Sequence, residues 1–233
     1  MKLGFVLPAT LICIMVAFLI SLGFWQLDRA DEKRAIESAI EVANTGAIEF
    51  IDSFEGLEYK EYYHIQLKGH YLPEKQFIYD NQIVQQTSGY YVLTPFVIDS
   101  SNSAILVNRG FIPWRGQRNQ LADISLFSMD EVIKVQVSKP VKRLELGQSE
   151  PDTVFPILLQ SLDLDSMSDI SGLQLSPVIG LLSPESGNGF VRQWKPYTGS
   201  IGKHLGYALQ WFAMALVLSI IGIRLGLKYR RGG

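Results

Sequence analysis

The sequence predicts a membrane protein with two transmembrane helices that flank a mainly β extracytoplasmic domain, an α+β unit built as a small antiparallel barrel or sandwich. Three observations predict it: an uncharged run at 3–23, a second at 205–223, and β-branched and aromatic runs between them. A helix of about 20 apolar residues is about 30 Å long and crosses a bilayer core. We therefore expect transmembrane helix 1 at 3–24, the outer domain at 28–203, transmembrane helix 2 at 205–223 and a basic tail at 224–233.

The first apolar run has two other interpretations. A buried core helix is one, but two such runs at opposite ends of a chain favour membrane spans. A cleaved signal peptide is the other, but the run is longer than a typical signal core and no clear A-x-A site follows it. Trp25, just beyond the run, suits the headgroup layer. The pattern favours an uncleaved anchor.

Charge is distributed unevenly and predicts the orientation. All 23 acidic residues lie between Asp28 and Glu185, whereas four basic residues follow the second apolar run between 224 and 231. Basic residues next to a span favour the cytoplasmic side, so both termini are expected in the cytoplasm and the central domain outside. Three basic residues between 29 and 34 argue the other way, and we give the C-terminal cluster more weight.

Composition excludes several classes of protein. The net charge is −2, which argues against a strongly basic nucleic-acid binder. Cys13 is the one cysteine, so the chain forms no internal disulfide and no multi-thiolate metal site. Neither a G-x-S-x-G nor an H-E-x-x-H hydrolase signature occurs, and the sequence has no dinucleotide or Walker loop. We expect a protein that is not an enzyme.

The middle of the chain is predicted to be mostly strand. A helix is expected to continue from the first span through 28–43, and a short helix is expected at 160–170. Turns are expected at Asp80-Asn81, Ser88-Gly89 and 186–189, and the segment 114–132 is expected to be a polar loop. The expected strands are 62–71, 76–79, 90–98, 104–107, 132–137, 178–182 and 190–194.

The three histidines differ in context. His64 and His70 fall in one predicted strand, too far apart to bind one metal ion, and surface or half-buried positions suit them. His204 begins the second span, and Tyr207 and Trp211 follow it on one helix face. An ionisable group at a membrane edge is a functional candidate, and imidazole is a common ligand of haem iron. An interfacial belt of His, Tyr and Trp that only sets the depth of the span is the alternative.

A second unusual segment is Asn108-Arg109-Gly110, followed by Pro113. Here a strand is expected to end: Gly110 permits a positive φ, Asn108 caps the turn and Pro113 fixes the exit. Arg109 is expected either as a buried pairing residue or as an anion contact.

Four segments in this order resemble the surfeit locus protein one family, and the resemblance covers nearly the whole chain. The first segment ends the first span and contains Trp25, Gln26 and Arg29, and the second, Tyr91–Phe96, contains Thr94 and Pro95. The third segment, Leu106–Pro113, contains Asn108, Arg109, Gly110 and Pro113. The fourth segment, His204–Phe212, contains Tyr207 and Trp211. Gly69 also matches a position of the family.

This resemblance implies a function that the residues alone do not. Family members are assembly factors for cytochrome c oxidase that help mature its catalytic subunit, at or near insertion of haem a. It implies a bacterial plasma membrane protein with a periplasmic domain, with membrane lipid, the oxidase catalytic subunit and other oxidase assembly factors as its partners. It also implies that His204 is the ligand of the haem iron, with Tyr207 and Trp211 beside the cofactor.

Three rival interpretations remain at this point. The first is a membrane-anchored chaperone that holds the oxidase subunit without binding haem. The second is an outer-face enzyme that uses paired carboxylates, which leave no short motif. The third is a permanent subunit of a respiratory complex.

Overall fold

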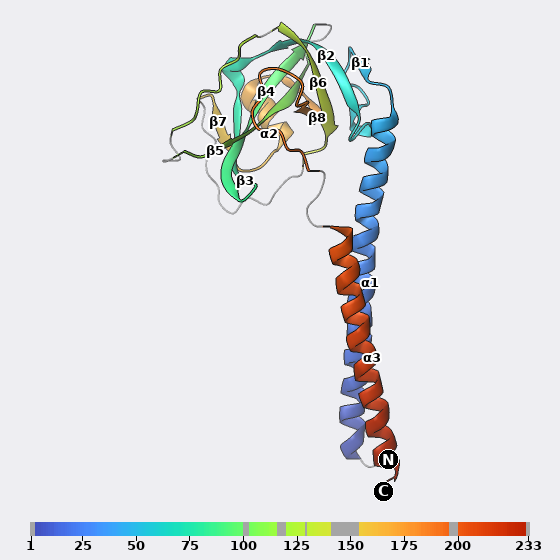
Figure 1. Cartoon of the computed structure of the whole chain (residues 1–233). Helices are drawn as coiled ribbons and strands as arrows, with labels where there is room; N and C mark the ends of the chain where they lie inside the picture. Colours follow the sequence, from blue (N-terminus) through green and yellow to red (C-terminus); the bar gives the residue numbers. More distant parts are fainter. Residues whose placement is uncertain are drawn as a thin grey trace. The chain divides into compact units, whose positions relative to one another are not determined.

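The computed structural model describes residues 3–99, 103–115, 120–128, 130–140, 154–195 and 200–231 (Figure 1). The chain forms two compact units. One contains the two ends of the chain, 1–39 and 195–233, and the other contains residues 40–194. Five positions of the predicted 114–132 loop, 116–119 and 129, lie outside the described residues, as do the last two residues of the predicted tail.

Two long helices form the first unit. Helix α1 covers Leu3–Thr45 and helix α3 covers Ile201–Arg231. Both are long and apolar enough to cross a membrane, and only 11% of each apolar window is buried within the protein. A core helix of a soluble protein would be mostly buried, so this low value favours membrane spans. Helix α1 continues beyond its apolar part without interruption, which confirms the helix predicted at 28–43.

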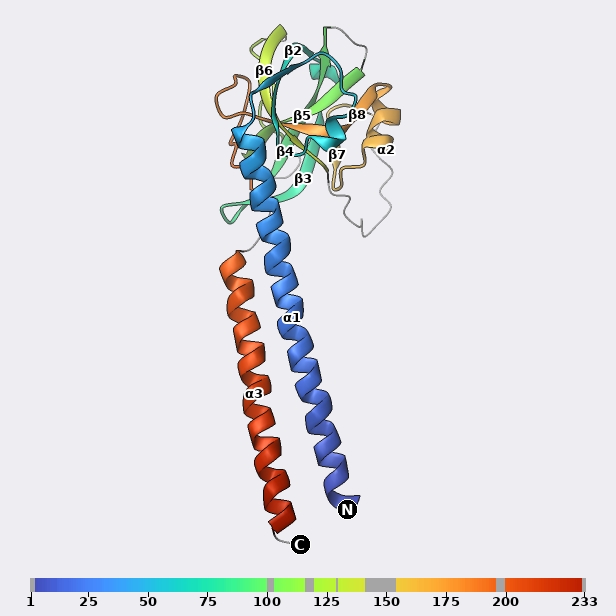
Figure 2. The same ribbon diagram turned by 90° about the vertical axis from the view of Figure 1, so that its right-hand side faces the viewer.

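The two helices pack side by side and antiparallel (Figures 1 and 2). A Cβ built on Gly222 of α3 would lie 3.0 Å from Ile12, and one on Gly23 of α1 would lie 2.5 Å from the ring of Phe212. Small residues at both contacts let the helix backbones approach closely. The start of α1 and the end of α3 therefore face the same side of any membrane that the pair crosses.

The second unit is a mainly β domain with one short α-helix, as the sequence predicted. Its described strands and helix are β1 (Glu49–Ile51), β2 (His64–Tyr71), β3 (Phe77–Val84), β4 (Thr87–Ile98), β5 (Ser103–Pro113), β6 (Asp130–Ser138), β7 (Ile157–Leu159), α2 (Leu164–Ser171) and β8 (Gln174–Leu182).

Five of these strands close a small barrel. The ring runs β2, β6, β8, β5, β4 and back to β2. Four of its pairings are antiparallel and one, β5 with β8, is parallel. Strands β1, β3 and β7 extend the sheet outside this ring and are seen beside it in Figure 1.

Alternate side chains of the ring strands point into the barrel, as the two-residue period of a strand requires. Tyr71 and Phe96 meet there edge to face, with ring centroids 4.9 Å apart. The buried interior consists of Phe54, Leu57, Ile65, Leu67, Tyr71, Phe96, Ile98, Ile105, Val107, Ile133, Val135, Val137, Val178 and Leu182.

Helix α2 covers part of the outer face of the sheet. Asp163 caps its first turn by accepting a hydrogen bond from the backbone N–H of Asp165 at 3.3 Å. Gly172 ends it in the left-handed conformation. Its buried Met167 belongs to the same apolar cluster as Leu106 of β5. The predicted helix at 160–170 is thus confirmed, with a start a few residues later.

The expected turns near β3 and β4 are wrong. Asn81 lies inside β3 with a φ of 56°, where the pairing with β4 shifts register, and Ser88-Gly89 lies inside β4. The chain reverses at Gln85 and Gln86, both with positive φ, as a two-residue hairpin requires. Glutamine is not a typical residue for this turn, so sequence pattern does not reveal it.

The strand expected at 190–194 is also wrong. Only Val191 forms a bridge, to Phe111 of β5. The indole N–H of Trp194 donates to the carbonyl of Leu182 at 2.9 Å, and the guanidinium of Arg192 donates to the carbonyls of Ser183 and Ser186. Hydrogen bonds from side chains, rather than backbone pairing, hold this segment in place. Its aromatic residues therefore do not indicate a strand here.

Asn108-Arg109-Gly110 forms a β-bulge rather than the end of a strand. Leu93 of β4 pairs with Asn108 and Val92 pairs with Gly110, so Arg109 is the extra residue and β5 continues to Pro113. The side chain of Asn108 accepts a hydrogen bond from the N–H of Gly110 at 3.1 Å, as predicted. Gly110 has a φ of 122°, which few residues other than glycine adopt.

The bulge carries a fully buried guanidinium. Arg109 is 1% exposed and donates from Nε to the carbonyl of Asn188 at 2.7 Å, from Nη1 to that of Ile124 at 2.9 Å and from Nη2 to that of Ser125 at 3.0 Å. Burial lowers the pKa of Arg109 to about 10, so the side chain stays charged at neutral pH. Arg109 is therefore the buried pairing residue of the two predicted roles, and its partners are backbone carbonyls.

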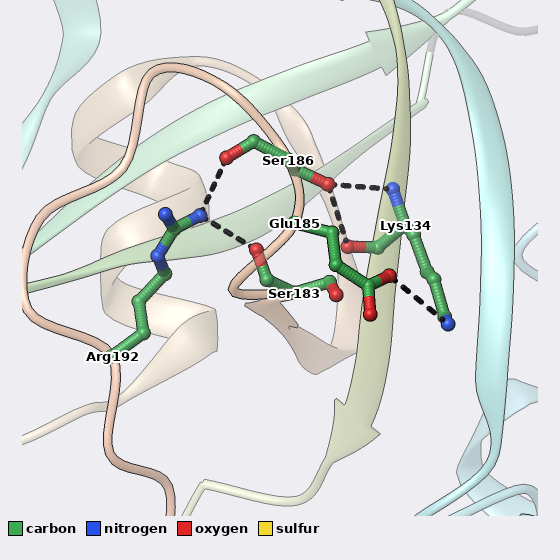
Figure 3. Close-up of polar contacts among 5 residues, drawn as sticks. All are labelled: Lys134, Ser183, Glu185, Ser186 and Arg192. Carbon is green, nitrogen blue, oxygen red and sulfur yellow. Dashed lines mark hydrogen bonds and ion pairs between the residues drawn. The ribbon is translucent and has the colours of Figure 1, made fainter.

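Asn188 links the same segments from the other side. Its side-chain oxygen accepts from the N–H of Phe127 at 2.7 Å, and its amide donates to the carbonyl of Ser128 at 2.9 Å. The loop that carries Asn188 is tied to β6: Ser186 bonds the backbone of Lys134, and the ammonium of Lys134 lies 3.5 Å from the carboxylate of Glu185 (Figure 3).

Replacement of Gly69 tests the closure of the barrel. A Cβ there would lie 1.9 Å from the carbonyl oxygen of Val97, where β2 crosses β4. We expect Gly69→Ala to lower the free energy of unfolding by at least about 1–3 kcal/mol, the usual cost of overpacking. Thermal unfolding of the full chain, followed by the circular dichroism of the β domain, measures it. Gly187→Ala, which meets no atom within 4 Å, is the control and is expected to unfold as the wild type does.

Replacement of Arg109 tests the buried guanidinium. Arg109→Met keeps the length of the side chain but leaves three backbone carbonyls without their donor, at about 1–3 kcal/mol for an unsatisfied buried group. We expect loss of stability and faster proteolysis within 120–128. Arg109→Lys is expected to fail as a rescue because one ammonium lacks the fork of donors. Lys68→Met, which removes an exposed ion pair, is the control, and an equal loss there would contradict the prediction.

Candidate functional site

The candidate site lies between α1 and α3, where their apolar runs end on the same side. Gln26 comes three residues after the last residue of the first run, and His204 comes one residue before the second. The Nδ1 atom of His204 lies 2.8 Å from the Oε1 atom of Gln26, which is hydrogen-bond distance. Two of the sequence motifs, at opposite ends of the chain, therefore meet in one contact.

The spacing of residues on α1 explains why Gln26 faces α3. Gly23, Gln26 and Ala30 are buried at intervals of three and four, as on one face of a helix, whereas Trp25 and Arg29 are exposed. Gln26 is 9% exposed, which is low for an amide side chain in a helix pair. A buried polar side chain needs a hydrogen-bonding partner, and His204 supplies it.

Aromatic packing sets the helix spacing close to this contact. The rings of Phe24 and Phe212 meet edge to face, with centroids 5.5 Å apart. The absence of a side chain on Gly23 leaves room for the Phe212 ring against the backbone of α1. The contact between Gln26 and His204 is thus held on a packed pair of helices.

The predicted neighbours of His204 are placed differently from one another. His204 and Trp211 are half-buried and follow the α3 face that also carries the buried Ala208 and Ala215. Tyr207 is 49% exposed and lies to the side of this face. Both aromatic side chains follow the histidine along the helix, one and two turns further on.

Trp25 and Arg29 form a separate cluster on the exposed side of α1. The guanidinium of Arg29 lies 5.7 Å from the centre of the Trp25 ring and 2.7 Å from the carboxylate of Glu32. A tryptophan and an arginine of this kind suit the boundary between apolar membrane and water. Of the first motif, only Gln26 joins the site.

The motif residues of the β domain form a structural group. Thr94 is fully buried, with its hydroxyl 3.5 Å from Nη1 of Arg109, and Pro95 lies opposite Leu106. Pro113 ends β5 opposite Gly89. Together with Gly69 and the bulge at 108–110, these residues shape the barrel and its attached loops.

The other candidate metal ligands form no cluster in the part of the chain that the structure describes. Within the described ranges, no group of three or more His, Cys, Asp or Glu side chains is placed to hold a metal ion. His64 and His70 lie on the face of β2 that points away from the barrel interior. Burial lowers the pKa of His64.

Sequence reasoning did not identify two important residues by role. Gln26 was expected only as part of a motif, because no pattern indicates a partner 178 residues away. Asn188 was expected only as part of the turn Ser186-Gly187-Asn188-Gly189. In the structure it has a φ of 55°, and its side chain bonds the backbone of Phe127 and Ser128.

Comparison with known proteins agrees with these motifs. The family model described as "SURF1 family" matches residues 13–216, which include every motif residue named above. Proteins named "SURF1-like protein" are similar along most of their length. The relative from Rickettsia conorii is 28% identical over 226 residues, covering 91% of this chain and 88% of its own, and that from Rickettsia felis is 28% identical over 225 residues, covering 90% and 92%.

A match over this much of the chain, with the two apolar helices and the central barrel in the expected order, confirms the resemblance found in the four motifs. The chain belongs to the SURF1 family, known as a family of oxidase assembly factors.

Proposed function

We propose that this chain assists maturation of the catalytic subunit of cytochrome c oxidase at the step of haem a insertion, without being an enzyme itself. In this proposal His204 contacts the iron of haem a, which is cargo rather than a permanent cofactor. The observation that carries the proposal is the half-buried imidazole at the end of an apolar helix, held by a buried amide of the opposite helix.

The residues present suit an apolar, flat, iron-containing molecule. The haem supplies an iron atom that binds neutral imidazole. His204 has its Nδ1 atom in the contact with Gln26, and its second nitrogen, Nε2, is not part of that contact. Tyr207 and Trp211, one and two turns further along α3, would provide apolar ring faces beside the bound molecule.

The position of the site supports transfer rather than storage. Haem a is poorly soluble in water, so a carrier that holds it at the membrane edge avoids a passage through solvent. A single protein ligand leaves the opposite side of the iron open to a ligand of the receiving subunit. The oxidase catalytic subunit and other oxidase assembly factors are the partners that this proposal requires, with membrane lipid around the helices.

The orientation is part of the proposal. Three basic residues lie in the last turn of α3, Lys228, Arg230 and Arg231, and basic residues favour the cytoplasmic side. In a bacterial plasma membrane both termini would then be cytoplasmic and the β domain periplasmic.

Labelling of single cysteines tests the orientation. In a Cys13→Ser background, which removes the one native thiol, Tyr59→Cys places a thiol on an exposed residue of the β domain, and Lys228→Cys places one at the end of α3. We expect a membrane-impermeant maleimide to label the first in intact spheroplasts and the second only after lysis. The reverse pattern would overturn the orientation.

Replacement of His204 tests the haem contact. We expect a strain without this protein to lose most of the a-type haem signal in a reduced-minus-oxidised spectrum of its membranes, with other cytochromes unchanged. Wild-type protein is expected to restore the signal and His204→Ala to fail. His70→Ala, which removes a histidine of the β domain, is the control and is expected to restore it.

Each other outcome identifies a different function. Full restoration by His204→Ala, at equal protein level, would favour a chaperone that holds the oxidase subunit without touching haem. An unchanged signal in the deletion strain would contradict a role in oxidase maturation. Stoichiometric presence of the chain in purified oxidase would indicate a permanent subunit.

A further inference from the structure

We infer that Gln26 is a positioning residue for His204: its side-chain oxygen accepts the hydrogen of Nδ1, which directs the lone pair of Nε2 toward the incoming iron. The inference rests on the proposed function and adds the residue that decides which nitrogen of the imidazole is the ligand. It starts from one contact, the 2.8 Å between Oε1 of Gln26 and Nδ1 of His204.

The chemistry of the two groups sets the direction of this hydrogen bond. An amide oxygen only accepts, so the Nδ1 atom facing it must carry the hydrogen. A neutral imidazole with hydrogen on Nδ1 has its free lone pair on Nε2. The iron would therefore be bound through Nε2, the nitrogen farther from the helix backbone.

The burial of Gln26 makes this arrangement a strong preference. Gln26 is 9% exposed and lies on the α1 face that packs against α3. If the histidine ring turned Nδ1 away, the amide oxygen would lose its hydrogen-bonding partner where water has little access. The ring is thus fixed both in its tautomer and in its direction.

A hydrogen-bond acceptor behind a ligating histidine also changes the ligand itself. It fixes the orientation of the ring and raises the basicity of the ligating nitrogen, and loss of such a partner typically weakens metal binding by about 10- to 100-fold. Gln26 is uncharged, so it strengthens the ligand less than a carboxylate would. That intermediate strength suits a site that must capture haem and then release it.

A purely structural role for Gln26 is the competing explanation. In that case the hydrogen bond would only join the helices, and any mutation that loosens the pair would have the same effect. Ile12 contacts Gly222 in the same helix pair, away from the site, so Ile12→Ala loosens packing without touching the hydrogen bond. It is the matched control.

The test uses the full chain in detergent, with ferric haem b as the probe. Gln26→Met keeps the length of the side chain and removes the acceptor, and Gln26→Glu keeps an acceptor at the same reach. In the haem-free chain, the ¹⁵N spectrum of labelled histidine, assigned by comparison with His204→Ala, reports which nitrogen carries the hydrogen. Absorbance titration then gives the dissociation constant for haem b.

We expect wild-type protein to carry the hydrogen on Nδ1 of His204. Gln26→Met is expected to give a mixture of tautomers and a dissociation constant raised about 10- to 100-fold. Gln26→Glu is expected to restore the hydrogen on Nδ1 and to bind haem b at least as tightly as the wild type does, whereas Ile12→Ala is expected to leave both values unchanged. Rescue by glutamate separates positioning from packing, because both variants fill similar space.

Two results would overturn the inference: an unchanged tautomer and affinity in Gln26→Met, or an equal loss in Ile12→Ala. Failure of the proposed function looks different. If wild type and His204→Ala bind haem b equally, the haem contact is wrong, whereas the ¹⁵N spectrum of the haem-free chain still shows whether Gln26 sets the tautomer.

Discussion

The β domain depends on one close crossing, at which β2 pairs with β6 on one side and with β4 on the other. Gly69 lies at this crossing, and the carbonyl of Val97 occupies the space that a side chain would need. Without the crossing the five-stranded ring would be an open sheet, and side chains such as Tyr71 and Phe96 would lie at an exposed edge. Closure of the ring therefore requires the close approach of β2 and β4.

The motif residues serve two different purposes, and the structure separates them. In the β domain they build shape: the bulge at 108–110 turns a charged guanidinium inward, where it holds the carbonyls of two loops together. In the helix pair two motifs meet, because Gln26 and His204 lie within hydrogen-bond distance where the apolar runs end. The family motifs therefore do not all belong to one site. Here some of the motif residues shape the barrel, and others form the separate candidate site.

Sequence patterns predicted what depends on local residues. Composition and period predicted the apolar runs, the helix beyond Gly23 and most strands of the barrel. The cap by Asn108 and the positive φ of Gly110 were also predicted, although the bulge that they form was not. The hairpin at Gln85-Gln86, the parallel pairing of β5 with β8 and the side-chain tethering of 190–194 depend on tertiary contacts that no local pattern encodes. For the same reason the sequence suggested His204 but not its partner, which is distant along the chain.

The separation between Gln26 and His204 has a consequence for biosynthesis. The two residues are 178 positions apart, and His204 belongs to α3, which is translated after the whole β domain. At about 5–20 residues per second, the amide is made on the order of 10–35 s before the imidazole. During that interval Gln26 lacks its partner His204, and the candidate site does not exist. Only a chain translated beyond His204 can therefore present the pair, so shorter products lack the candidate site.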